Sequence, residues 1–203
     1  MDIIDIANYN EPLKHIVGEN TVTPELIGFF DEVKSNKSLQ KQLYYTKELS
    51  DVAMVANKLG FNITAAEVLR AQAGRLLELL ETDVKEVAIA AAGEKPNKVA
   101  QWGREGRGYL EKAGYWLIRL SQWGYKIEDI NKDITDFFEN INKRKLFYDE
   151  VFVCSTFNEI EEVAKENQFK ITATALIHYQ ALCITKLEDQ HAELVAHGKI
   201  DCG

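Results

Sequence analysis

The sequence LGFNITAA at residues 59–66 returns, in diverged form, as NQFKITAT at residues 167–174. Placing every residue on the one 108 positions later aligns 24–81 with 132–189 without a gap. The identical pairs include Phe29/Phe137, Phe30/Phe138, Lys37/Lys145, Ala56/Ala164, Phe61/Phe169, Ile63/Ile171, Thr64/Thr172 and Gln72/Gln180. Self-similarity at a fixed offset indicates that the chain contains an internal duplication.

The first copy has the pattern of a small helical unit. Thr23 and Pro24 form a helix start, and the apolar residues that follow have the i, i+3, i+4, i+7 spacing of one helix face. This helix is predicted to end near Ser35. A short helix and a third helix closed by Gly60 follow, and the residues 64–67 (TAAE) form a capping box that opens a long helix. The first copy is therefore predicted to contain four helices. Their apolar positions are Leu26, Phe29, Phe30, Val33, Leu39, Leu43, Leu49, Val52, Val55, Ala56, Val68, Leu69, Leu76 and Leu80.

The second copy predicts the same helices with three local differences. Residues 156–159 (TFNE) supply a capping box that the first copy lacks. Gln168 stands where the first copy has Gly60, so this helix is expected to end without the glycine that favours a left-handed cap. Ala175 replaces the acid of the first capping box. The last helix is predicted to run on to Gly198.

Between the copies lies a segment rich in tryptophan and glycine. Its aromatic residues follow one another in steps of seven, which is one stripe of a helix. We expect this stripe to seal the two copies against each other and its surroundings to bind a protein partner. The candidate partner-binding residues are Trp102, Arg104, Arg107, Tyr109, Trp116 and Trp123. The expected division is a cap at 1–23, a first repeat at 24–81, a helical connector at 82–131, a second repeat at 132–189, and a helix end and tail at 190–203.

Composition narrows the classes of function. With 46% apolar and 28% charged residues and a net charge of −8, the chain is typical of globular proteins. Residues 84–126 carry 8 basic and 4 acidic side chains, too small a surplus for nucleic acid as a main partner. No apolar run reaches the length of a membrane span. Three cysteines without paired spacing, and no N-terminal signal, favour reduced thiols in a cytoplasm.

No pattern of residues predicts catalysis, a cofactor or a metal site. His178 and Cys183 lie five residues apart on one predicted helix, which does not direct both toward one ion. Cys154 and Cys183 occupy apolar faces and are expected to be small buried residues. No combination of serine, histidine and acid at interpretable spacing occurs. We therefore predict a protein that is not an enzyme.

The repeat unit resembles the Nif-eleven family. The resemblance rests on FFDEV at 29–33, on Leu39 and Leu43, and on the stretch from Val55 to Glu67 that contains GFNITA. It implies small helical domains in a cyanobacterial or nitrogen-fixation setting, present here as two tandem copies. In many members such a domain is a leader region, which a modifying enzyme recognises before it is cut from a peptide product.

Two features distinguish this chain from the leader plan that the resemblance implies. It contains no Gly-Gly dipeptide, and its residues after Gln190 include one cysteine but no serine or threonine with which a thioether ring could form. The predicted fold is therefore all-α, with two homologous helical-bundle repeats joined by the Trp/Gly-rich connector. The hypothesis for function is an adaptor that binds a protein partner and forms a homodimer. A leader-type precursor and a binder of a small ligand or pigment near the tryptophans are the alternatives.

Overall fold

The computed structural model describes residues 23–44, 46, 49–77, 81–82, 84–85 and 132–197. All regular secondary structure within these ranges is helical. The first helical set consists of α2 (Pro24–Ser35), α3 (Lys37–Tyr44), α4 (Leu49–Lys58) and α5 (Ala65–Leu77). The second helical set consists of α8 (Lys132–Lys143), α9 (Lys145–Phe152), α10 (Phe157–Glu166) and α11 (Ala173–Thr185), and α12 (Asp189–Ala196) follows it.

Every helix of the first set begins and ends 108 residues before its counterpart in the second set. The turn between the third and fourth helices is also built alike in both sets. Gly60 N–H donates to the Asn57 carbonyl at 3.1 Å, and Gln168 N–H donates to the Lys165 carbonyl at 3.0 Å. Both turn residues have positive φ, 93° for Gly60 and 68° for Gln168. The substitution has therefore left the turn in place, and the glutamine itself adopts the left-handed conformation.

The predicted helix starts are confirmed by the hydrogen bonds of their caps. The Thr23 hydroxyl accepts from the Leu26 amide, and Thr64 and Glu67 make the reciprocal bonds of a capping box at 3.1 and 2.8 Å. The predicted box of Thr156 and Glu159 is present in α10. Each cap satisfies amides that a first helical turn cannot satisfy itself.

The last helix does not run on to Gly198 as the sequence predicted. Helix α11 ends at Thr185, and α12 begins at Asp189 after a break at residues 186–188. The apolar positions continue through the break, since Leu187 is fully buried. The break arises from a tertiary contact, because the Leu187 carbonyl accepts a hydrogen bond from the guanidinium of Arg70 on α5 at 2.6 Å.

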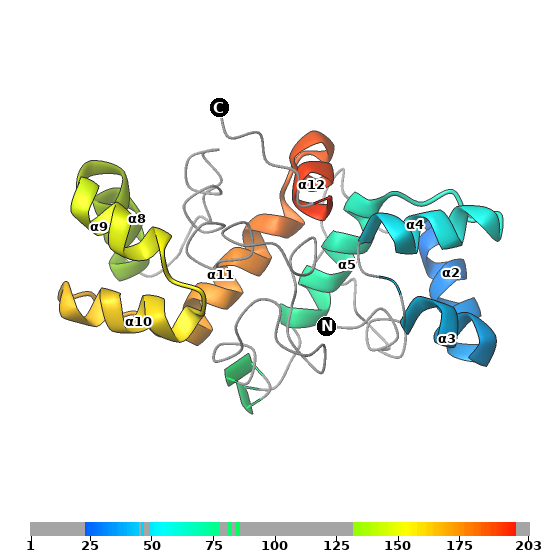
Figure 1. Cartoon of the computed structure of the whole chain (residues 1–203), viewed down its shortest axis with the longest axis horizontal. Helices are drawn as coiled ribbons and strands as arrows, with labels where there is room; N and C mark the ends of the chain where they lie inside the picture. Colours follow the sequence, from blue (N-terminus) through cyan, green and yellow to red (C-terminus); the bar gives the residue numbers. More distant parts are fainter. Residues whose placement is uncertain are drawn as a thin grey trace.

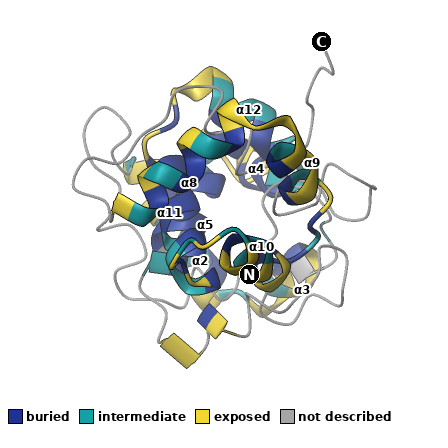
Figure 2. Cartoon of the chain, turned by 90° about the vertical axis from the view of Figure 1, so that its left-hand side faces the viewer, coloured by how far each residue is buried: buried dark blue, intermediate teal, exposed yellow. Residues whose placement is uncertain are grey.

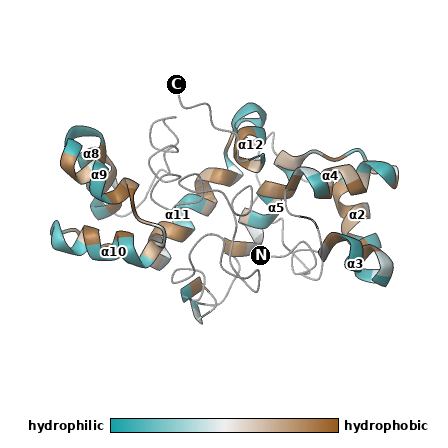
Figure 3. Ribbon diagram, in the orientation of Figure 1, coloured by the Kyte–Doolittle hydropathy of each residue, from teal (hydrophilic) through white to brown (hydrophobic). Residues whose placement is uncertain are grey.

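Helices α5 and α11 lie at the centre of the molecule. Figure 1 places α2, α3 and α4 at one end and α8, α9 and α10 at the other, with α5 and α11 between them. Helix α5 contacts both α11 and α12. Figure 2 shows α5 and α11 as largely buried, and Figure 3 shows hydrophobic residues along both. A helix that is apolar on most sides is expected to be enclosed by others.

Aromatic rings fill the core of each end. Phe29 packs against Phe61 with ring centroids 5.8 Å apart, and Phe137 packs against Phe169 at 5.6 Å, so the same contact occurs in both sets. The second set adds Phe147, whose ring lies 5.3 Å from that of Phe137. The equivalent turn residues Ile63 and Ile171 are both buried.

Candidate interaction surface

The predicted partner-binding residues lie outside the described part of the chain. The connector stripe and its two arginines all fall within residues 86–131, as do most residues of the predicted connector. Their roles, and the expected sealing of the two sets by the stripe, stay predictions. The candidate surface must therefore be sought among the described helices.

Five large apolar side chains of the described residues are at least half exposed. Three of them belong to the first helical set, where Ile27 on α2, Met54 on α4 and Leu59 after α4 are each 50% exposed. Leu146 and Val153 are the two in the second set. Single exposed apolar residues are ordinary on protein surfaces, so their number alone carries no conclusion. What supports a conclusion is the comparison of each exposed apolar residue in the first set with the residue at the same position in the second.

The turn after α4 brings part of this surface together. A Cβ atom at Gly28 would lie 3.0 Å from Cε1 of Phe61, so the α2 backbone passes directly against the Phe61 ring. Ile27 neighbours this contact in the chain, and Leu59 lies two residues before Phe61. Phe61 itself is only partly buried. The beginning of α2 and the turn that follows α4 therefore form one partly apolar surface.

The second helical set is polar at the same positions. Ile27, Met54 and Leu59 correspond to Thr135, Glu162 and Asn167, and Gly28 corresponds to Asp136. Most core positions of the two sets have stayed apolar, as have the turn residues Phe61 and Phe169, with the buried Ala53 opposite Glu161 as an exception. The contrast at the three exposed positions is therefore not part of a general loss of apolar residues. Sequence reasoning missed these residues, although the alignment of the two copies contained the signal.

The titratable groups of the described helices offer no preformed catalytic set. The described residues contain no group of three histidine, cysteine, aspartate or glutamate side chains that could hold a metal ion. Cys154 and Cys183 are buried thiols, as predicted, and burial raises the pKa of Cys183 to about 12. Burial lowers the pKa of His178. The thiol is thereby kept protonated and the imidazole neutral, which suits packing.

Polar groups are also buried where the two sets meet. Gln180 on α11 is fully buried, and neither atom of its amide has a hydrogen-bond partner within the part of the chain that the structure describes. Its counterpart Gln72 on α5 is 2% exposed. Arg70 on α5 is 3% exposed and donates to the Asp189 carboxylate at 2.7 Å. These residues join the sets, and none of them reaches the apolar surface of α2 and the turn.

No helix of the described residues has the length and apolar character needed to cross a membrane. Residues 23–68 match the family model of the Nif11 domain. The match is compatible with the family of precursors and leader-like peptides that the sequence resembles. No curated protein and no solved structure matches the chain. The matched residues include the whole of the candidate surface, so this surface belongs to a single region that is similar to the Nif11 domain.

Proposed function

We propose that this protein is a non-enzymatic interaction protein that binds a protein partner through the first helical set. The observation that carries the proposal is the contrast at Ile27, Met54 and Leu59, which are half exposed and apolar where the second set has polar residues. Burying apolar surface is the main favourable term in most protein association, at about 25 cal/mol per Å². A partner that covers these side chains gains that term.

We infer that the second helical set is a diverged second copy of the same domain. Support comes from the constant offset of 108 residues between the helix bounds and from the matching backbone bonds of the turns. Phe61 N–H donates to the Ala56 carbonyl at 3.0 Å, and Phe169 N–H donates to the Ala164 carbonyl at 2.9 Å. On this view the second copy has kept the packing but not the apolar surface. Its role is to support the first copy.

The test exchanges the surface residues between the copies. A variant with Ile27→Thr, Met54→Glu and Leu59→Asn gives the first set the residues of the second. The matched control makes the opposite changes, Thr135→Ile, Glu162→Met and Asn167→Leu. Tagged protein is recovered from its source cells after crosslinking, and the captured proteins are quantified by mass spectrometry. We expect one stoichiometric partner with the unaltered chain and with the control, and at least a tenfold loss with the first variant.

Equal recovery by the unaltered chain and the first variant would contradict the proposal. A far-ultraviolet circular dichroism spectrum and a thermal unfolding curve of each variant show whether the helices have been kept. Because Ile27, Met54 and Leu59 are exposed, we expect the first variant to change stability by less than about 0.5 kcal/mol. The control loses the hydrogen bonds of the Asn167 side chain to Arg144, Glu150 and the Val163 carbonyl, so we expect it to be less stable by about 1 kcal/mol.

The match to the Nif11 domain favours a second candidate, a leader-type precursor. Intact mass of the recovered protein separates the two functions. An interaction protein is recovered at its full 23.1 kDa. A precursor is recovered shortened, or lighter by the mass of lost water, together with the enzyme that modified it. We also propose a reducing cytoplasm as its compartment, which the two buried free thiols support.

A further inference from the structure

Helix α12 follows the second helical set in the chain but binds to the first. Its contacts are with α5, and its apolar side is buried. The buried residues of this helix are Ala192, Val195 and Ala196, and Leu187 just before it is buried as well. In Figure 1 this helix lies beside α5, away from the outer helices of either set. The end of the chain that the structure describes thus returns to the first copy.

Two polar contacts anchor α12 on α5. At one, Glu193 Oε1 accepts from the Ala66 amide at 3.0 Å, in the first turn of α5, while Glu193 Oε2 lies 3.2 Å from Nε2 of His197. At the other, Arg70 Nη2 donates to the Leu187 carbonyl and to Asp189 Oδ1, which is 2.7 Å away. Arg70 is the only charged residue classed as buried among those described. Detachment of α12 would remove both of these acceptors and open the guanidinium to water, which can take their place as hydrogen-bond partner.

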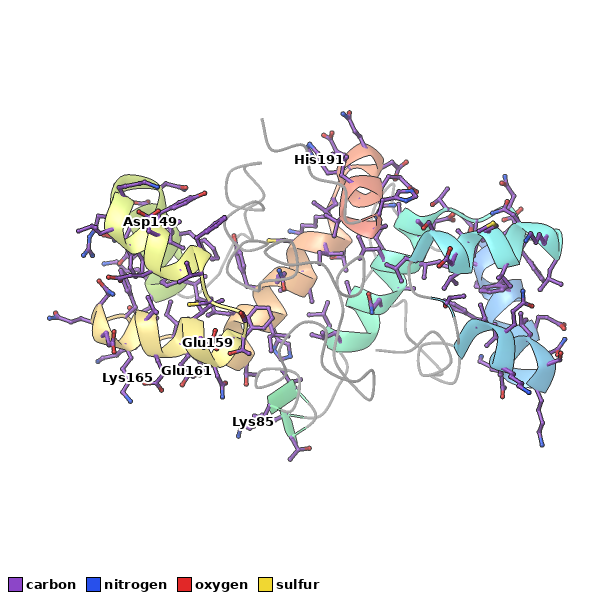
Figure 4. All side chains as sticks on the ribbon, viewed as in Figure 1. Lys85, Asp149, Glu159, Glu161, Lys165 and His191 are labelled. Atoms are coloured by element: carbon purple, nitrogen blue, oxygen red, sulfur yellow. The ribbon has the colours of Figure 1, made fainter. Side chains whose placement is uncertain are left out.

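The second set satisfies the corresponding helix start from within itself. There, Glu161 on α10, labelled in Figure 4, accepts at 2.6 Å from the amide of Ala173, the first residue of α11 and one position before the counterpart of Ala66. The first set has Ala53 at the position of Glu161, so its own third helix offers no such carboxylate. The first turn of α5 receives its carboxylate from α12 instead, 127 residues along the chain. The carboxylate at the start of α5 therefore comes from outside the first set, whereas the one at the start of α11 comes from within the second.

The structure of α12 favours opening without unfolding of the rest. A helix of eight residues is marginal in isolation. Its N-cap residue Glu188 makes no capping hydrogen bond through its side chain, and two of its three buried residues are alanines. The side chain of Asp189 is 83% exposed, so water competes for its contact with Arg70. Helix α11 buries nine residues and has no comparable weakness.

We propose that α12 is a detachable clamp that controls access to the first helical set. It contacts the first turn of α5, and residues 64–66 at the start of that helix follow within five positions of the partly buried Phe61. A partner that covers Leu59 and Phe61 and also the residues that follow them in the first set would contact Glu193 and α12. The inference rests on the proposed function for its partner, but opening of the clamp is measured without one.

The test is hydrogen exchange of single amides in the full chain, measured by NMR. The Ala66 amide is the reporter, because it lies in the first turn of α5 and its acceptor is Glu193. We expect the amides of Ala66, Ala192 and His197 to exchange together and faster than those in the middle of α11. Glu193→Ala is expected to accelerate exchange at Ala192 and His197 by about tenfold, the effect of losing one charge-assisted hydrogen bond, and to leave α11 unchanged. The Ala66 amide loses its acceptor in this variant and therefore reports on opening only in the unaltered chain.

The control is Glu161→Ala, which removes the carboxylate at the start of α11 in the second set, where it accepts from the amide one position before the counterpart of Ala66. It should accelerate exchange at Ala173 and leave Ala66 and α12 unaffected. If the amides of α12 exchange no faster than those of α11, in the unaltered chain or in Glu193→Ala, the proposal that α12 detaches is wrong. The amount of partner recovered should rise in Glu193→Ala. If α12 opens in this variant but the recovered amount does not change, α12 does not regulate access to the first helical set. If the variant with Ile27→Thr, Met54→Glu and Leu59→Asn recovers as much partner as the unaltered chain while α12 still opens, the proposed function is wrong. The proposal that α12 detaches then still holds.

Discussion

Gly60 and Gln168 occupy equivalent turns with very different chemistry. Both have the left-handed backbone, which glycine adopts freely and which costs other residues about 1–2 kcal/mol. The backbone bonds donated by these two residues and by the phenylalanine that follows each of them nevertheless agree within 0.1 Å. The surrounding packing, above all the buried Ile171 and the ring of Phe169 against Phe137, therefore imposes this conformation on Gln168.

We expect Gln168→Gly to raise the free energy of unfolding by about 0.5–1 kcal/mol, because relief of backbone strain exceeds the extra entropy of the unfolded chain. The opposite change, Gly60→Gln, should lower it by about 1 kcal/mol. No atom lies within 4 Å of a Cβ at Gly60, so that loss would come from the backbone alone. Urea unfolding of the full chain measures both. A neutral result for both variants would show that the left-handed conformation is not the source of strain.

At the scale of the element, Glu67 joins the starts of two helices. Its carboxylate accepts from the Thr64 amide and also from the Thr23 hydroxyl at 2.8 Å, which is the cap of α2. Glu67→Ala should therefore lower the free energy of unfolding by about 1–2 kcal/mol, more than loss of a capping box alone. Glu162→Ala is the control, since Glu162 is exposed and 4.0 Å from Lys165, and should change stability by less than about 0.5 kcal/mol. Equal losses would exclude a special role for Glu67.

Most helix bounds could be predicted because they depend on residues close in the chain. The end of α11 was predicted wrongly because it involves a contact with a residue far away in the chain. The start at Pro24, the end at Ser35 and the two capping boxes each depend on residues close in the chain, so the sequence predicted them correctly. The end of α11 depends on Arg70, whose bond to the Leu187 carbonyl joins residues 117 positions apart. Apolar spacing alone continues through this break and predicted one long helix.

At the scale of the whole molecule, the sequence predicted two helical sets with matching bounds, but it did not predict how the sets pack on each other. The most buried helices, α5 and α11, are equivalent to each other and pack together. Their apolar residues predict burial, but they do not show whether the neighbouring helix belongs to the same set or to the other one. The exposed apolar surface could have been found by asking where the copies differ in polarity. Sequence reasoning had sought it in the aromatic stripe, because aromatic residues are enriched at interfaces.

Cys183 reports on whether the centre of the molecule unfolds as one unit. The thiol is fully buried on α11, and burial raises its pKa to about 12, so at pH 8 it is held as the unreactive protonated form. We therefore expect iodoacetamide to modify Cys183 only through global unfolding, with the urea dependence of the equilibrium transition. Peptide mapping separates this cysteine from Cys154 and Cys202. Glu193→Ala, which should open α12 alone, ought to leave the rate at Cys183 almost unchanged. Rapid modification of Cys183 in native buffer would mean that α11 separates from α5 without global unfolding, and the two sets would then be independent bodies joined at a weak contact.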